Sequence, residues 1–140
     1  MGGAMSGAGG RPRTAGDWGP IARKGRQIMI FITAKFLIKP AHADQWPGIA
    51  AAFTGATRAE PGCLWFDWSR SVEDPDVYVL VEAFADDEAG GAHVQSEHFR
   101  AAQRELPPHL QETPRIVNSS VPGTEWSELG EMAVGTSDQP

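Results

Sequence analysis

The fold is decided by two alternating segments in the stretch CLWFDWSRSVEDPDVYVLVEAF, Cys63 to Phe84. Successive side chains of a β-strand point to opposite faces of the sheet, so each alternation predicts a strand. The turn residues Asp74, Pro75 and Asp76 between them predict a hairpin. Both faces of this hairpin are apolar. One face carries Leu64, Phe66, Trp68, Tyr78, Leu80 and Phe84, and the other carries Cys63, Trp65, Val77, Val79, Val81 and Ala83.

Helical patterns and further strands flank the hairpin on both sides. Asp44 is the expected N-cap of the first helix, which the residues Glu60, Pro61 and Gly62 end. Asp86 and Ser96 are expected to begin two short helices after the hairpin. The remaining expected elements are a strand at 28–39, the first helix between Asp44 and Glu60, helices at about 87–94 and 97–105, and a strand at 115–121. The order βαββαβ predicts an α+β fold of the ferredoxin-like, split βαβ type.

The second apolar face of the hairpin carries a prediction about assembly. Helices from one subunit can cover only one face of a sheet, and the other face would meet water. We therefore expect the sheet of an identical subunit to close over the face bearing Trp65, Val79 and Val81. The expected partner is a second copy of the chain, in a homodimer.

Composition divides the 140 residues into three parts. Residues 1–27 are Gly-rich and have no periodicity, so we predict a disordered leader. Residues 28–121 form the expected domain, and residues 122–140 form a C-terminal extension that we expect to be partly packed through Trp126, Leu129, Met132 and Val134. No apolar run is long enough to predict a membrane span.

Charge and cysteine content exclude several classes of function. The net charge is −6, and the basic residues form no stripe, so nucleic acid is not an expected partner. Cys63 is the single cysteine, which excludes an internal disulfide and a thiolate metal cluster. We therefore expect a cytoplasmic protein. The chain has no Gly-rich phosphate loop and no GxSxG elbow, so any chemistry would rest on dispersed groups in an apolar pocket.

His93, Glu97 and His98 form the only fragment that suggests a metal. Five residues on a continuous helix separate the two imidazoles by about 140°, so they would not share a face. We therefore predict surface or capping histidines here and no metal site.

Glu82 and His93 are the candidate catalytic residues. Glu82 sits on the same strand face as Leu80 and Phe84, where a carboxylate is costly unless it is paired. Either it forms a structural ion pair or it is a pocket carboxylate that handles a substrate proton. His93, on the helix face over the sheet, is either a buried structural histidine or a proton acceptor. Phe66, Trp68, Phe84 and Phe99 are either core residues or the walls of a flat hydrophobic cavity.

The stretch RAEPGCLWFDWSRSVEDPDVYVLVEAFADDEAGGAHVQSEHFRA, Arg58 to Ala101, resembles the antibiotic biosynthesis monooxygenase (ABM) family, including its quinol monooxygenases. The resemblance covers about residues 29–121, and TEWSELGEM, Thr124 to Met132, is similar to the extension of some relatives. It implies a ferredoxin-like subunit that pairs into a dimeric α+β barrel. It also implies oxidation of a phenolic or quinol-type aromatic by molecular oxygen without metal, flavin or other cofactor.

Under this resemblance, His93 and Glu82 handle protons, while Phe66, Trp68, Phe84 and Phe99 bind the aromatic substrate. Phe84 stands where oxygenase relatives often have tryptophan. Gln103 stands at the position of the haem ligand in haem-degrading relatives, and residues 28–39 contain no Asn, so haem degradation is disfavoured. The alternative function is a non-catalytic, dimeric small-molecule-binding or stress-response protein of the same fold.

Overall fold

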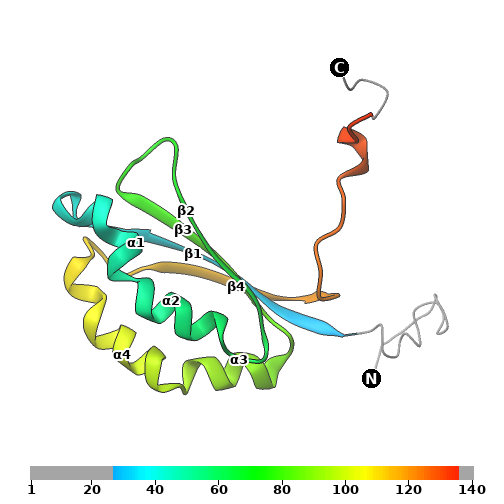
Figure 1. Cartoon of the computed structure of the whole chain (residues 1–140), viewed down its shortest axis with the longest axis horizontal. Helices are drawn as coiled ribbons and strands as arrows, with labels where there is room; N and C mark the ends of the chain where they lie inside the picture. The colour runs from blue at the N-terminus through cyan, green and yellow to red at the C-terminus, as the bar shows by residue number, and fades with distance from the viewer. Residues whose placement is uncertain (1–26, 136–140) are drawn as a thin grey trace.

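A computed structural model describes residues 27–135, in which a four-stranded antiparallel sheet carries helices on one face (Figure 1). The strand order is β2-β3-β1-β4. The strands are β1 Ile28–Leu37, β2 Cys63–Arg70, β3 Val77–Phe84 and β4 Arg115–Pro122. The helices are α1 Trp46–Ile49, α2 Ala51–Arg58, α3 Asp87–Val94 and α4 Glu97–Glu105, with 3-10 turns η2 Pro40–Gln45, η3 Pro107–His109 and η4 Gly130–Met132. The predicted βαββαβ, ferredoxin-like α+β fold is confirmed. The predicted leader, apart from Gln27, lies outside the described residues.

Strand register sets which side chains meet the helices. Glu82 of β3 lies opposite Ile32 of β1 and Phe66 of β2. Because alternate residues share a face, the helix-covered face includes Phe66, Leu80, Glu82 and Phe84. Helices α2 and α4 lie across this face (Figure 1). The core between the layers is centred on fully buried side chains: Ile38, Trp46, Phe66, Leu80 and Phe84.

Helices α3 and α4 are separate because each has its own cap. The Asp86 carboxylate accepts a hydrogen bond from the Ala89 N–H at 2.8 Å, which begins α3. The Ser96 hydroxyl accepts from the Phe99 N–H at 3.1 Å and donates to the His93 carbonyl at 2.7 Å. Side-chain acceptors of this kind satisfy backbone donors that a helix leaves free. The predicted boundaries 87–94 and 97–105 are therefore confirmed.

The prediction that Asp44 caps the first helix is wrong. Pro40 begins the 3-10 turn η2, and α1 follows directly after Gln45, which makes no side-chain capping bond. Asp44 lies within this turn, and its carboxylate pairs with the Arg70 guanidinium at 2.9 Å. The helical segment also divides at Ala50, between α1 and α2.

No helix of residues 27–135 covers the opposite face of the sheet (Figure 1). Phe31, Val79 and Val81 on this open face are half-buried. Trp126 of the extension packs on Trp65, with ring centroids 5.1 Å apart. Trp126 is nevertheless 70% exposed, and the extension then continues away from the sheet (Figure 1), with Leu129, Met132 and Val134 also exposed. Closure of the open face by a second copy stays a prediction.

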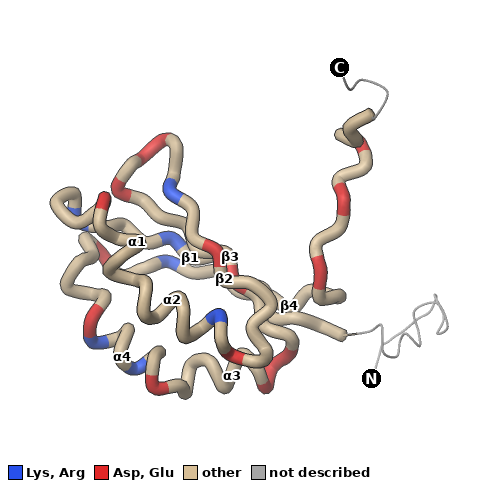
Figure 2. The backbone as a smooth tube through the Cα atoms, viewed as in Figure 1, with Lys and Arg blue, Asp and Glu red and all other residues tan. Residues whose placement is uncertain are grey.

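Charged residues are dispersed along the described chain, and Lys and Arg do not gather on one element (Figure 2). No helix among residues 27–135 has the length and apolarity to span a membrane.

Candidate functional site

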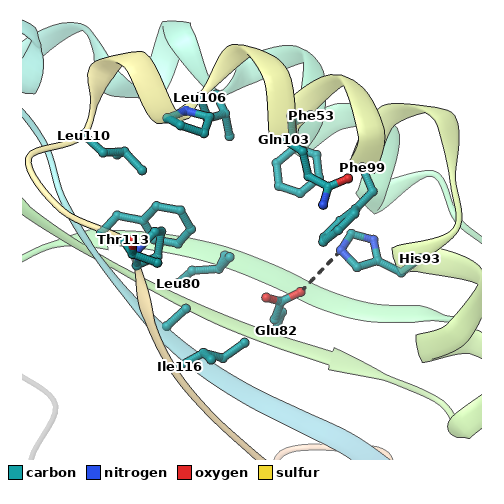
Figure 3. Close-up of a pocket in the computed structure, with 15 residues that line it drawn as sticks. Phe53, Leu80, Glu82, His93, Phe99, Gln103, Leu106, Leu110, Thr113 and Ile116 are labelled. Carbon is teal, nitrogen blue, oxygen red and sulfur yellow. Dashed lines mark ion pairs between the residues drawn. The ribbon is translucent and has the colours of Figure 1, made fainter.

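A cavity of about 530 Å³ lies between the sheet and helix α4 (Figure 3). Its volume is within the range of small-molecule sites. The polar side chains in its lining are Glu82, His93, Gln103 and Thr113. The remaining lining is apolar and comes from β1, β3, β4, α2, α4 and the segment between α4 and β4: Ala34, Phe36, Phe53, Leu80, Phe99, Ala102, Leu106, Pro107, Leu110, Pro114 and Ile116. The cavity suits a mainly hydrophobic molecule that carries few polar groups.

Glu82 is a buried carboxyl group, one oxygen of which makes no hydrogen bond within residues 27–135. Its side chain is 8% exposed, and its Oε1 atom has no hydrogen-bond partner among the described residues. Burial, and secondarily the charge of Glu60, raises the pKa of Glu82 from 4.5 to about 7. Both causes act in the same direction, because each disfavours the ionised form. At neutral pH this group can therefore both accept and release a proton.

His93 links Glu82 to a second carboxylate. Its Nδ1 atom lies 2.9 Å from Oε2 of Glu60, and its Nε2 atom lies 3.9 Å from Oε1 of Glu82. Figure 3 shows the imidazole directed at the Glu82 carboxyl group. Phe84 stacks on the imidazole, with ring centroids 4.8 Å apart, and the Phe99 ring meets it edge to face at 5.1 Å. The ring is thus held by Glu60 and two aromatic side chains, with one nitrogen facing the cavity.

The four aromatic residues predicted to bind substrate occupy different places. Phe99 lines the cavity. Phe84 lines a separate hollow of about 430 Å³ beside β4 and α3. Phe66 and Trp68 do not line either of these spaces, and the prediction that they form the pocket wall is corrected. Both lie on β2 beneath α2, where Phe66 is 1% exposed and the Trp68 indole N–H donates to the Thr54 hydroxyl at 2.9 Å.

Several lining residues were missed by the sequence analysis. Phe53 comes from α2 and Gln103 comes from α4, whereas Leu106 and Leu110 lie in the segment between α4 and β4. Gln103, Leu106 and Leu110 are three or four residues apart, and together with Phe99 they continue the inward face of the helix that ends at Glu105. This spacing is the signal in the sequence that could have identified them.

Glu60 and His98 form a cluster with His93 that the sequence analysis also missed. His93 and His98 both contact Oε2 of Glu60. One ligand-type atom from each residue lies within 4.8 Å of those of the other two. The prediction that five-residue spacing separates the imidazoles is wrong, because it assumed a continuous helix, whereas α3 ends at Val94 and Ser96 caps a new helix. Glu97, the carboxylate considered there, is 94% exposed, and Glu60 takes its place.

The family model for the antibiotic biosynthesis monooxygenase domain matches residues 29–105. The chain belongs to the antibiotic biosynthesis monooxygenase family. The matched segment contains Glu82, His93 and Phe99, together with Glu60 and His98. The ABM resemblance of the sequence is thereby confirmed at the level of the family.

Solved structures of ABM proteins and their relatives share the fold. A protein described as antibiotic biosynthesis monooxygenase is 27% identical, with a TM-score of 0.59 over 64% of this chain and 95% of its own. PA3566 from Pseudomonas aeruginosa is 26% identical, with a TM-score of 0.60 over 67% and 94% of the two chains. Rv0793 from Mycobacterium tuberculosis is 21% identical, with a TM-score of 0.60 over 72% and 98%, and shows the fold alone. No curated protein matches the chain.

Proposed function

We propose that this ABM protein is a monooxygenase that oxidises a phenol- or quinol-type aromatic with molecular oxygen, the substrate itself supplying the electrons. The observation that carries the proposal is the composition of the cavity. A buried carboxyl group with a free oxygen and an imidazole lie side by side in a space otherwise lined mainly by apolar and aromatic side chains. Such a space can hold an aromatic ring and deprotonate its hydroxyl group in a dry environment.

The proposed chemistry requires only proton transfer from the protein. Glu82 takes the phenolic proton, with His93 beside it, and the electron-rich phenolate passes one electron to O2. The phenoxyl and superoxide radicals join at a ring carbon, and the proton is returned to the peroxide oxygen. When that carbon loses its hydrogen as a proton, a C=O bond forms, the O–O bond breaks, and the departing hydroxide becomes water. One phenol and one O2 thus give one quinone and one water.

The two proton-handling groups have different surroundings, which suggests different roles. Glu82 has the free oxygen and the pKa of about 7, and a base is most effective when its pKa is near the working pH. His93 is held at Nδ1 by Glu60 and presents Nε2 to Glu82. We therefore assign proton acceptance from the substrate to Glu82. We assign to His93 the orientation of the Glu82 carboxyl group and the onward transfer of the proton.

The aromatic walls support an aromatic substrate. Phe53 and Phe99 both line the cavity, and their ring centroids are 6.2 Å apart. Aromatic rings prefer offset or edge-to-face contacts at about 4.5–7 Å. A planar substrate in the cavity can meet both rings at such distances while its hydroxyl group reaches Glu82.

The proposed active form is a homodimer in the cytoplasm, with the two subunits joined through their open sheet faces. Half-buried Phe31, Val79 and Val81 supply an apolar surface there. Permanent interfaces of this kind commonly bury more than about 2,000 Å². A lone thiol such as Cys63 is compatible with a reducing compartment.

Oxygen consumption with a panel of mono- and dihydroxyaromatics tests the function directly. The expected result is one O2 consumed for each quinone formed, at a rate that Glu82→Gln lowers. Glu97→Gln, which alters a 94% exposed carboxylate, is the matched control and should retain the rate. If the same compounds bind and no oxygen is consumed, the oxygenase proposal fails and the alternative of a non-catalytic binding protein is favoured.

A further inference from the structure

We propose that Glu60, His93 and His98 form a binding site for one divalent cation of the zinc class. The three side chains come from the ends of three elements: the turn after α2, the last turn of α3 and the first turn of α4. His93 Nδ1 lies 2.9 Å from Glu60 Oε2, His98 Nε2 contacts the same oxygen, and the three atoms lie within 4.8 Å of one another.

The donor set fits zinc better than magnesium or calcium. Imidazole nitrogen is a good zinc ligand, whereas magnesium and calcium prefer oxygen donors. Bonds of about 2.0–2.2 Å in a tetrahedral site place ligand atoms roughly 3.4 Å apart. The two contacts that Glu60 makes with the imidazoles are shorter than this, because hydrogen bonds join the groups, so the side chains would have to move apart there to admit the ion.

The backbone around the cluster is already fixed in the required arrangement. The Ser96 hydroxyl caps α4 and also donates to the His93 carbonyl at 2.7 Å. This one side chain therefore ties the backbone of His93 to the start of the helix that carries His98. Preorganisation of this kind lowers the entropic cost of assembling a ligand set.

Glu82 provides a second observation that points to a metal-bound His93. A metal-ligating histidine usually donates its other ring N–H to a carboxylate or a carbonyl group. The free Oε1 of Glu82, on a side chain 8% exposed, lies 3.9 Å from His93 Nε2. With a cation at Nδ1, the proton of the ring must be on Nε2, and a small rotation would let it donate to this otherwise unpartnered oxygen.

The site is reachable from solvent, and two of its three residues lie outside the cavity lining. The side chains of His98 and Glu60 are 24% and 13% exposed, and neither residue lines the large cavity. A bound cation would therefore contact His93 on the side away from the substrate, with its fourth position open to water. The metal site does not depend on the proposed oxygenase activity.

Calorimetric titration of the full, untagged chain with zinc chloride tests the site. We expect one Zn²⁺ per chain, and a tetrahedral visible spectrum when Co²⁺ is used instead. His98→Ala and Glu60→Gln should each weaken zinc binding at least tenfold. The double variant His42→Ala, His109→Ala is the matched control, because these are the other two histidines and they form a pair of their own, with Nδ1 atoms 2.7 Å apart. It should bind zinc as the unmodified chain does.

Two further measurements test whether each variant is folded and whether zinc stabilises it. Circular dichroism shows whether each variant is folded, and zinc should raise the Tm of the unmodified chain and of the control but not of Glu60→Gln. If the unmodified chain binds no zinc, or if binding survives His98→Ala and disappears in the control, the proposal is overturned. Because neither readout is enzymatic activity, failure of the metal site and failure of the oxygenase proposal are distinguishable.

Discussion

Replacing Glu82 by Gln should change how the stability of the protein depends on pH. Burial raises the pKa of Glu82 in the folded state from 4.5 to about 7. The folded state therefore binds the proton more tightly than the unfolded chain does. Between these two pH values, Glu82 is protonated more often in the folded state than in the unfolded chain. The contribution of the Glu82 carboxyl group to stability is fully present below about pH 4.5 and is lost as the pH rises through about 7. Gln cannot ionise, so the variant should lack this loss.

The expected size follows from the two pKa values. A change from 4.5 to about 7, at about 1.36 kcal/mol per pH unit, corresponds to roughly 3 kcal/mol. Only a small part of this loss has occurred at about pH 5, and nearly all of it has occurred at about pH 8. Relative to the unmodified protein, Glu82→Gln should therefore gain roughly 2–3 kcal/mol in unfolding free energy between these conditions. Any constant cost of burying the amide cancels in this difference.

Urea denaturation at about pH 5 and about pH 8, at one fixed protein concentration and with EDTA present, measures the difference. Linear extrapolation provides the four free energies of unfolding. Glu97→Gln is the control, because its carboxylate is 94% exposed and its two curves should follow those of the unmodified protein. If the Glu82→Gln and unmodified curves run parallel within about 0.5 kcal/mol, the carboxyl group is not desolvated as described.

Three other outcomes are expected. His93→Ala should lower turnover of a phenolic substrate by a factor of about 10² to 10⁴ while the chain stays folded. A smaller loss of turnover in Glu82→Gln would assign the carboxylate the supporting role, and unchanged turnover in both variants would favour a binding protein. Trp65→Asp should make the dimer scarce in light scattering, because it places a charge on the open face. Val72→Asp, in an exposed turn, is the control and should leave the molecular mass unchanged. A monomeric mass for the unmodified protein at micromolar concentration would contradict the dimer. Ser96→Ala should lower the unfolding free energy by about 1 kcal/mol through loss of the α4 cap, and an unchanged denaturation midpoint would count against that role.

The strands and the α3 and α4 boundaries could be predicted because their signals are local. Alternation in β2 and β3 depends on residues two apart, and the Asp86 and Ser96 caps act on N–H groups three residues ahead. Asp44 failed as a cap because an equally local competitor, the 3-10 turn that begins at Pro40, had already started the helical segment. The Arg70 partner that Asp44 uses lies in another strand and cannot be inferred from neighbouring residues.

The candidate site could be predicted only in part. Glu82 and His93 stood out because a polar group on an apolar face is visible in the sequence itself. Glu60 did not, since it lies 33 residues before His93 and meets it only because α2 packs against α4 and the turn after α2 packs against α3. Phe66 and Trp68 were assigned to the cavity because alternation shows which face a residue occupies. Whether a helix covers that position or leaves a space is decided by tertiary packing.

The sheet separates the cavity from the open face, and this has a consequence for binding measurements. The large cavity lies on the helix side, between the sheet and α4, while a second copy is expected on the opposite side. Each chain of a dimer would then hold a complete binding site of its own. An aromatic ligand should accordingly saturate at one molecule per chain along a simple hyperbola, with a Hill coefficient of about 1.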